Sequence, residues 1–351
     1  MLTARQNLWE TIKGGNPDRL VNQYEAFSLQ SSPFALHNPN PVKGGPEVVN
    51  AWGVTRVYPA NTPGAFPVHT PDKIVIKDIE HWRDYVKFPE LNFTDEEWDM
   101  FKKKYDAVDR DKAFATAMFA PGLFEQSHYL SEITNALIYY MEDEDEMHDL
   151  INAMADWELE LVKQICDKLH PDAVLHHDDW GSETNSFLRP EMFEDYFLEP
   201  YQRIYGYMHD HGVKVIMHHS DSYCANLVPT MIEMGIDIWQ GAMYSNNIPE
   251  LIKKYGPQIT IMGGIDNKFC DFAGSTPEDA YKATEKLISE CGTKFYIPCI
   301  TQGGPGSVFP GVYGDIGDEI RKYNYEHYGF TPEEQLAGAV EEVIMFGGKR
   351  K

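Results

Sequence analysis

The sequence is short of cysteine, and none of its cysteines are closely paired. Five cysteines are spread over 351 residues, and no Cys-x-x-Cys pair occurs. Small domains held by disulfides and zinc ribbons both depend on such pairs, so both classes are disfavoured. Unpaired thiols fit a reducing compartment, and we therefore expect a cytoplasmic protein.

Long hydrophobic runs and an excess of positive charge are also missing. No segment approaches the roughly 18 consecutive apolar residues of a membrane-spanning helix. The first 13 residues mix charged and apolar side chains at helical spacing, which predicts an amphipathic helix rather than a secretory signal. Lys and Arg number 30 against 55 Asp and Glu, a formal net charge of −25. Because such a surface repels nucleic acid and anionic lipid, we expect neither as a partner.

Several common catalytic motifs are absent too. The chain contains no His-Glu-x-x-His, no Walker loop, no Gly-x-Gly-x-x-Gly and no Gly-x-Ser-x-Gly. These absences disfavour zincin proteases, P-loop nucleotidases, dinucleotide-binding folds and α/β-hydrolases.

What the sequence does contain is a series of short apolar segments that alternate with helical patterns. A stripe of apolar residues predicts a long helix over Glu146–Leu169. Thr94, Thr276 and Thr331 are predicted to begin further helices. The expected strands are Leu20–Ala26, Ala113–Phe119, Asp172–His176, Lys214–Met217, Ile236–Gln240, Gln258–Met262 and Phe295–Pro298.

Repeated strand–helix units predict a parallel sheet. Seven expected strands without a break in composition favour one α/β domain over residues 1–351, a (β/α)₈ TIM-type barrel with an N-terminal helical and loop extension. The segment Ser32–Thr70 is rich in Pro, Asn and Gly, and we interpret it as a long loop or small insertion over one face. The acidic run Glu142–Glu146 is interpreted as a solvated connection between two helices.

In a barrel, functional groups lie at the carboxyl ends of the strands. The segments that follow four of the expected strands are rich in imidazole, carboxylate and thiol groups: His177–Glu183, His218–Cys224, Gly263–Asp266 and Cys299–Gly304. Nitrogen, oxygen and sulfur ligands of this kind form catalytic Zn²⁺ sites, so we expect a divalent metal at this rim. Each residue alone also has an ordinary explanation, because a lone cysteine is often a small buried apolar side chain.

The order of these motifs resembles the uroporphyrinogen decarboxylase superfamily, in its branch of corrinoid-dependent methyltransferases. The resemblance runs over nearly the whole chain and rests on five segments: the opening Arg5–Arg19, the Asp-Asp-x-Gly-like His177–Gly181, the Pro-Glu-x-Phe-like Arg189–Phe193, the strand end Val215–Asp221 with Ile232–Gly235, and the turn Ile297–Ile300. It implies a (β/α)₈ barrel and a zinc site built from His-x-Cys and a later Cys.

Carried over by position, the resemblance makes His219 and Cys299 the first and last metal ligands. Asp221 stands where the family has its middle Cys. The third ligand is then Asp221 itself or Glu183, and a set containing oxygen leaves zinc more Lewis-acidic than a thiolate-rich set does. Such an ion suits the polarisation of an ether oxygen better than the activation of a thiol.

The function that this resemblance implies is O-demethylation. A methyl group would move from a methyl ether, in the first place a methoxylated aromatic, to the Co(I) of a corrinoid (cobalamin) held by a partner protein. Catalytic roles fall to Asp221 and to Asp178 or Asp179, which orient a ligand or the phenolic oxygen, or else cap backbone amides. The candidates for the wall of the substrate pocket are Met118, Trp180, Tyr223, Trp239 and Tyr244.

Three alternatives stay open. One is a methylcobalamin:thiol methyltransferase, which the missing second cysteine disfavours. Another is a porphyrinogen decarboxylase, which would grip its polyanionic substrate with arginine, yet Gln23–Gln30 contains none. The third is a barrel without catalysis that serves as a partner of a corrinoid protein or as a ligand sensor. A homodimer is compatible with each of them.

Overall fold

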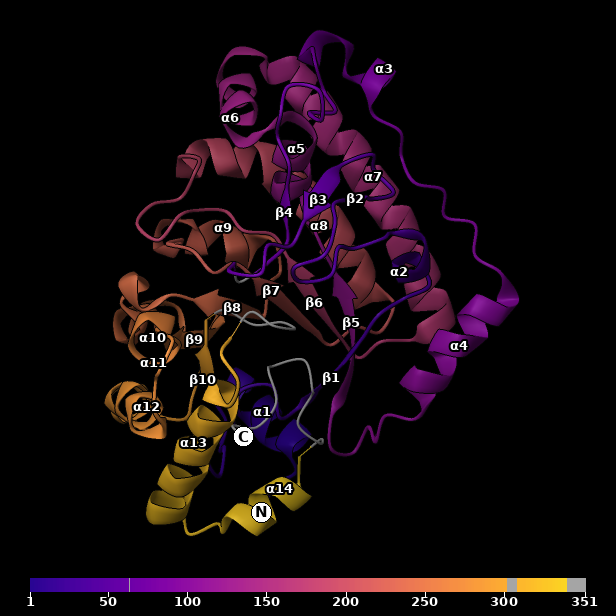
Figure 1. The fold of residues 1–351 in the computed structure, drawn as a ribbon. Helices are drawn as coiled ribbons and strands as arrows, with labels where there is room; N and C mark the ends of the chain where they lie inside the picture. Colours follow the sequence, from indigo (N-terminus) through magenta and orange to yellow (C-terminus); the bar gives the residue numbers. More distant parts are fainter. Residues whose placement is uncertain (63, 302–307, 340–351) are drawn as a thin grey trace.

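The computed structural model describes residues 1–62, 64–301 and 308–339. A curled parallel sheet lies at its centre, with its strands in the order β1-β5-β6-β7-β8-β9-β10 and helices on its outer side (Figure 1). This arrangement confirms the predicted α/β class and is consistent with a TIM-type barrel. Seven strands are described rather than eight, and β1 and β10 stand at the two ends of the strand order within the described ranges. The strands are β1 (Phe27–Gln30), β5 (Phe114–Phe119), β6 (Ala173–His177), β7 (Val215–His219), β8 (Ile238–Ala242), β9 (Thr260–Ile265) and β10 (Tyr296–Ile300).

The helices begin where the sequence places capping residues. Thr94 and Thr331 each form a capping box with the glutamate three residues later, and the helix after Thr276 begins with Pro277. The acidic run Glu142–Glu146 contains the junction of two helices, but only Asp143 lies between them. One helix ends at Glu142 and the next begins at Glu144, so Glu144–Glu146 form the first turn of a helix rather than a connection. The helices are α1 (Ala4–Lys13), α2 (Phe34–His37), α3 (Trp82–Tyr85), α4 (Asp95–Asp106), α5 (Leu123–Ser131), α6 (Ile133–Glu142), α7 (Glu144–Leu169), α8 (Pro190–Asp210), α9 (Val228–Glu233), α10 (Ile248–Tyr255), α11 (Asn267–Cys270), α12 (Pro277–Cys291), α13 (Val312–Tyr328) and α14 (Pro332–Ala337).

Six of the seven predicted strands are confirmed, with their ends displaced by at most three residues. The seventh, Leu20–Ala26, is wrong, because β1 begins only at Phe27. Gln23 has a φ of 50°, and Phe27 N–H donates to the carbonyl of Tyr24, so this stretch turns instead of extending. Its apolar residues are buried by packing rather than by strand pairing, and sequence pattern does not separate the two.

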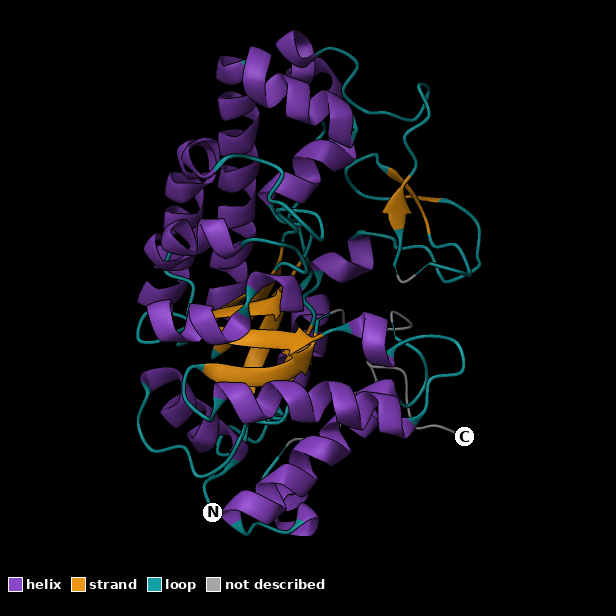
Figure 2. Cartoon of the chain, turned by 90° about the vertical axis from the view of Figure 1, so that its left-hand side faces the viewer, coloured by secondary structure: helices purple, strands orange, loops and turns teal. Residues whose placement is uncertain are grey.

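The segment Ser32–Thr70 forms an insertion with a small sheet of its own. The antiparallel strands β2 (Val48–Val49), β3 (Thr55–Val57) and β4 (Phe66–Pro67) pair in that order, and Figure 2 shows them apart from the central sheet. This outcome agrees with the predicted insertion over one face.

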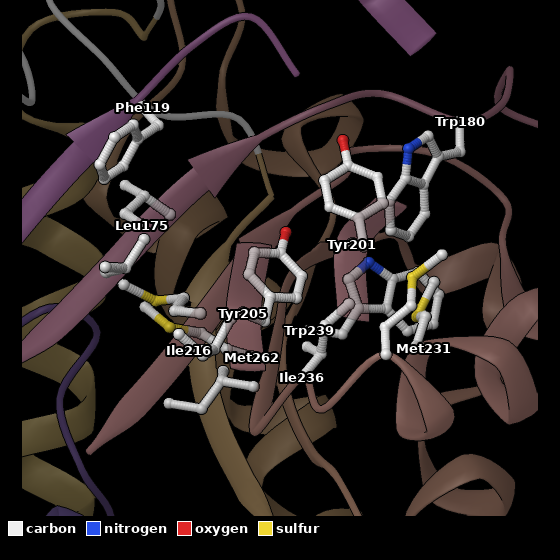
Figure 3. Close-up of a cluster of buried hydrophobic side chains, with 14 of the residues drawn as sticks. Phe119, Leu175, Trp180, Tyr201, Tyr205, Ile216, Met231, Ile236, Trp239 and Met262 are labelled. Atoms are coloured by element: carbon white, nitrogen blue, oxygen red, sulfur yellow. The ribbon is translucent and has the colours of Figure 1, made fainter. Parts of the chain in front are cut away.

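The core between the sheet and α8 contains large aromatic side chains. Figure 3 shows the ring of Trp180 beside that of Tyr201, and the ring of Tyr205 near Ile216 and Met262; all five side chains are almost completely buried. The hydroxyl group of Tyr205 lies within hydrogen-bond distance of buried histidines on β6 and β7, so polar groups inside this core are paired. None of the described helices is both long enough and apolar enough to span a bilayer.

The buried carboxylate of Asp172 ties the N-terminal helix to the start of β6. It accepts two hydrogen bonds of 3.2 Å from Arg5 and one of 2.5 Å from Arg110. We expect Asp172→Asn to lower the free energy of unfolding by about 2 kcal/mol, because two partly buried cations lose their counter-charge. Urea unfolding at neutral pH measures the loss, and Asp167→Asn, an exposed position on α7, is the control.

The same contact makes the stability difference depend on pH. Burial raises the pKa of Asp172, but Arg5 and Arg110 outweigh burial and hold the pKa below its usual range. The stabilisation is therefore complete above the unfolded-state pKa of about 3.9 and is lost as the pH falls towards the folded value. Wild type and Asp172→Asn should converge in stability only below that pH. A difference that persists unchanged in acid would contradict the assignment.

Candidate metal centre and adjoining cavities

Two histidines lie side by side at the carboxyl ends of neighbouring strands. His177 is the last residue of β6 and His219 the last of β7, and the two residues pair in register. Because side chains at matched positions of parallel strands point to the same face, their rings stack, with centroids 4.4 Å apart and an interplanar angle of 21°. The register of the sheet thus creates a pair of imidazoles at the rim.

Each of these rings is oriented through its Nδ1 atom. Nδ1 of His177 lies 2.7 Å from Oε2 of Glu125, and Nδ1 of His219 donates to Oε1 of Gln240. The Nε2 atoms are then turned towards Asp179, at 3.9 Å from its Oδ2 for His177 and 3.8 Å from its Oδ1 for His219. The potential ligand atoms of these three residues all lie within 4.8 Å of one another, so they can bind one ion.

A glycine in β8 leaves room for the second ring. Gly241 has a φ of 87° and sits at an irregularity in the pairing of β8 with β9. A Cβ atom there would lie 3.1 Å from ring atoms of His219 and from the backbone nitrogen of Asp221. Both the backbone conformation and the close approach therefore favour glycine at this position.

Carboxylates make the site attractive to a cation. Burial lowers the pKa of His177, but Glu125, Asp179 and Asp221 outweigh burial and raise it to about 10. The pKa of His219 is lowered by burial and by the neighbouring His177. Burial and Asp179 raise the pKa of Asp221 well above its usual range. Negative charge thus exceeds positive charge around the two rings, which is the electrostatic condition for binding a divalent cation.

A cavity of about 440 Å³ opens onto these groups. His177, Asp179, His219 and Asp221 form one side of it, and the backbone nitrogen of Asp221 donates to Oδ1 of Asp179 at 2.9 Å. The insertion supplies the opposite side, through Asn38, Asn40, Arg56, Gly64, Ala65 and Phe66. The insertion therefore covers the carboxyl end of the sheet, as the sequence predicts.

The structure brings together some of the predicted ligands and not others. His219 and Asp221 face this cavity. Cys299 is completely buried on β10, where burial raises the pKa of its thiol while the nearby amide of Gln240 lowers it. Glu183 forms a 2.7 Å ion pair with Lys268 and lines a different cavity, of about 530 Å³. The residues 302–304 that follow the strand of Cys299 lie outside the described residues.

Asp178 and Asp179 are neighbours in sequence with different surroundings. Asp178 is buried and accepts hydrogen bonds from the backbone nitrogens of Phe124 and Glu125, from Nε1 of Trp180 and from the hydroxyl of Tyr201. These contacts support the alternative role of Asp178, capping backbone amides at the start of α5. Asp179 instead reaches the cavity.

The candidates for the pocket wall are also separated. Met118 lines a second cavity, described below. Trp180 and Trp239 are buried, with the Trp180 ring stacked on His218 at a centroid distance of 3.8 Å. Tyr244 lies beside Lys286 in a cavity away from the histidines. The backbone nitrogen of Tyr223 donates to the carbonyl of Ser182 in the loop after β6.

Sequence reasoning missed three residues of this centre: His177, Glu125 and Gln240. His177 was noted only as part of a strand-end segment, and its pairing with His219 follows from a register that the sequence does not state. Glu125 lies on α5, 52 positions from its partner, and Gln240 comes 21 positions after His219. A glutamine at the end of a strand, next to a strand ending in His-His, is the signal that could have been used.

Alanine substitutions of Asp178 and Asp179 should distinguish a residue that stabilises the fold from one that binds metal. We expect Asp178→Ala to lower the free energy of unfolding by about 3 kcal/mol, since four buried donors lose their acceptor. Asp179→Ala should cost less than about 1 kcal/mol but abolish tight binding of a divalent metal. Chemical unfolding and metal titration of both variants measure these effects. Equal stability of the two variants would contradict the capping role.

Comparisons with known proteins place the chain in a family. The family model described as "Uroporphyrinogen decarboxylase (URO-D)" matches residues 49–303, which is more than half of the chain. A methyltransferase from Methanosarcina mazei has a similar structure, with a TM-score of 0.63 and 11% identity over 92% of this chain and 99% of that one. D-psicose 3-epimerase gives a TM-score of only 0.38 at 11% identity, over 68% of this chain and 86% of that one. No curated protein matches the sequence. This chain belongs to the uroporphyrinogen decarboxylase family.

Proposed function

We propose that this chain is a metal-dependent methyltransferase, the methyl-transferring component of an O-demethylase. It would transfer the methyl group of a methyl ether, in the first place a methoxylated arene, to the Co(I) of a corrinoid carried by a separate protein. The observation that carries the proposal is the convergence of two oriented imidazoles and a carboxylate in one cavity. The fold shared with a methyltransferase is consistent with it.

The donor atoms at this centre fit zinc. Two imidazole nitrogens and a carboxylate oxygen form a common catalytic zinc set, and the contacts of Glu125 and Gln240 with the Nδ1 atoms are the outer contacts that such ligands have. We therefore keep His219 as a ligand, assign His177 and Asp179 beside it, and place Asp221 next to them. Cys299 and Glu183, implied by the family resemblance, are not needed for this set. When bound, zinc supplies Lewis acidity for the oxygen that gives up its methyl group.

The protein's own groups then have distinct tasks. Glu125 and Gln240 each engage the Nδ1–H of one ring, so that both Nε2 atoms are turned to the cavity. A bound metal would take the place of the proton that the surrounding carboxylates favour on His177. Asp221 offers a carboxyl oxygen to the same space. The insertion keeps bulk water from one side of the cavity, which strengthens electrostatic interactions within it.

The two other enzymatic functions fit this cavity less well. A porphyrinogen carries many carboxylates, and this cavity presents Glu125, Asp179 and Asp221, with Arg56 as the one Arg or Lys among its described lining residues. A thiol acceptor calls for a soft, thiolate-rich metal site, whereas the donors here are nitrogen and oxygen. The transfer of methyl from an ether is the function that this chemistry supports best.

Metal content discriminates between the two ligand sets. We expect His177→Ala, Asp179→Ala and His219→Ala each to weaken zinc binding by at least about 100-fold, and Gln240→Leu, which loosens one ligand, by about 10- to 100-fold. Cys299→Ala should keep stoichiometric zinc, because its thiol is outside the set. Competition with a chromophoric chelator and metal analysis provide the affinities.

The control is Cys166→Ala, a buried cysteine on α7 outside the centre. If Cys299→Ala loses zinc while His177→Ala keeps it, the ligand set implied by the family resemblance is correct and ours is wrong. If the purified protein contains stoichiometric iron in place of zinc, the identity of the proposed metal is wrong but the proposed ligand residues stand.

Activity tests the reaction itself. Zinc-loaded protein, a corrinoid protein reduced to Co(I) and 2-methoxyphenol should yield methylcobalamin and catechol in equal amounts. The cobalt absorption spectrum and chromatography of the phenol measure both products, and Asp179→Ala should reduce the rate by at least about 100-fold. Unchanged cobalt spectra over a panel of aryl and alkyl methyl ethers would refute the proposal. Loss of methylcobalamin that depends on an added thiol would support the thiol methyltransferase instead.

A further inference from the structure

A second cavity adjoins the metal centre. It encloses about 250 Å³ and shares Asn38, Asn40, Ala120 and Pro121 with the larger cavity that opens onto the histidines. Its other walls come from α2, α5, α7 and the end of β5. A ligand seated in it therefore lies next to the space in front of the metal ligands.

Aromatic rings form one wall of this second cavity, which we call the recess. The Trp157 ring lies 5.3 Å from Phe34 and 4.7 Å from Trp52 between centroids, with interplanar angles of 66° and 71°. Nε1 of Trp157 donates to the carbonyl of Pro89 at 2.8 Å, and Trp52 packs edge-on against Phe88. The rings are thus fixed by contacts outside the recess. Rings held in this way present preformed apolar surfaces, which suit a flat apolar ligand.

Two buried polar side chains line the same recess, Gln126 with 3% of its surface exposed and Glu158 with 6%. Neither the Nε2 nor the Oε1 atom of Gln126 has a hydrogen-bond partner among the described residues. Buried amides are normally satisfied, so a group inside the recess is the natural partner for this one.

A chain of buried polar contacts leads from His218 to the neighbourhood of Glu158. Nε2 of His218 lies 3.2 Å from the carbonyl of Asp178 and donates to it, so Nδ1 of His218 accepts from the hydroxyl of Tyr205. That hydroxyl accepts from Nδ1 of His176, which leaves Nε2 of His176 as an acceptor, 3.1 Å from Oε1 of Glu158. Neither of these two atoms has a hydrogen-bond partner among the described residues. Burial raises the pKa of Glu158 well above its usual range, which favours its uncharged form.

The size of the recess limits the ligand. A cavity of about 150 Å³ in an apolar core is known to bind benzene. The recess, at about 250 Å³, accommodates one six-membered ring with one or two small substituents. It is too small for a tetrapyrrole.

We infer that this recess binds the ring of the methyl donor, and that the donor is an uncharged single-ring arene bearing a hydroxyl or methoxy substituent. Gln126 and Glu158 pair with that substituent, and the aromatic wall contacts the ring. The ether oxygen is thereby directed to the shared border with the metal cavity. The inference rests on the proposed function for the reaction, but arene binding is measured without it.

A matched pair of tryptophan substitutions tests the recess. Ala35 and Leu36 are neighbours on α2, both exposed, but only Ala35 lines the recess. Isothermal titration of 2-methoxyphenol into the whole chain, as isolated and after chelation, gives its Kd. Ala35→Trp should weaken binding at least about tenfold by filling the entrance, and Leu36→Trp should leave the Kd within about twofold.

The polar groups are tested with a second pair. Gln126→Leu should weaken the binding of 2-methoxyphenol about three- to tenfold. The affinity for toluene should not change, because toluene makes no hydrogen bond to Gln126. Glu158→Gln should also weaken the binding of 2-methoxyphenol. The control is Glu319→Gln, at another buried glutamate on α13 outside the recess, which should leave the Kd unchanged. Circular dichroism verifies that each variant is folded.

The outcomes separate this inference from the proposed function. If methyl transfer proceeds but Ala35→Trp keeps the wild-type Kd and KM for the arene, the recess is not the donor site although the reaction stands. If arenes bind in the wild type and are blocked by Ala35→Trp while cobalt is never methylated, the arene site stands and the proposed reaction falls. Absence of arene binding at millimolar concentration overturns the inference.

Discussion

The register between β6 and β7 is the constraint on which the rest of the site depends. Because His177 and His219 are exact partners across the two strands, their rings stack at one rim and share a carboxylate. A slip by one residue in either strand would turn that strand's ring to the other face and separate the pair. The register is held by the continuous burial of both strands, so the energy that forms the core also aligns the proposed metal ligands.

Successive side chains of a strand point to opposite faces of the sheet, and this alternation gives the two histidines at the end of each strand different surroundings. His176 and His218, one residue earlier, point to the opposite face, where Tyr205 of α8 bridges them inside the core. Desolvation there favours the neutral rings, and a neutral ring needs a defined donor and acceptor. The inner pair is therefore joined through Tyr205 by hydrogen bonds, with Nε2 of His176 3.1 Å from Oε1 of Glu158, while the outer pair faces the cavity. Four residues of one type have two physical roles because a strand has two faces.

Much of this was accessible from the sequence, and what was missed has a common cause. Alternating strands and helices and the capping threonines are local patterns, and they predicted the α/β class correctly. The imidazole and carboxylate groups at the strand ends form a local pattern too, and they indicated the rim as the candidate site. The strand expected at Leu20–Ala26 failed because burial by packing resembles burial by pairing. Glu125 and Gln240 could not be assigned, since their role depends on contacts across helices and strands. The family resemblance carried Cys299 and Glu183 into the ligand set by position, whereas the geometry favours groups that converge on one point.

The position of the recess relative to the metal centre bears on the choice of reaction. Attack on a methyl group by a nucleophile requires the leaving oxygen to be stabilised on the side opposite the incoming cobalt. A ring held against the aromatic wall with its ether oxygen towards His177 and His219 would meet this requirement, because these residues would hold the ion that supplies Lewis acidity for that oxygen. A thiol acceptor needs no aromatic recess, and a porphyrinogen needs a larger one. The adjacency of an aromatic recess and a carboxylate-rich cavity is therefore the feature that favours the proposed demethylation of an arene over the other reactions considered.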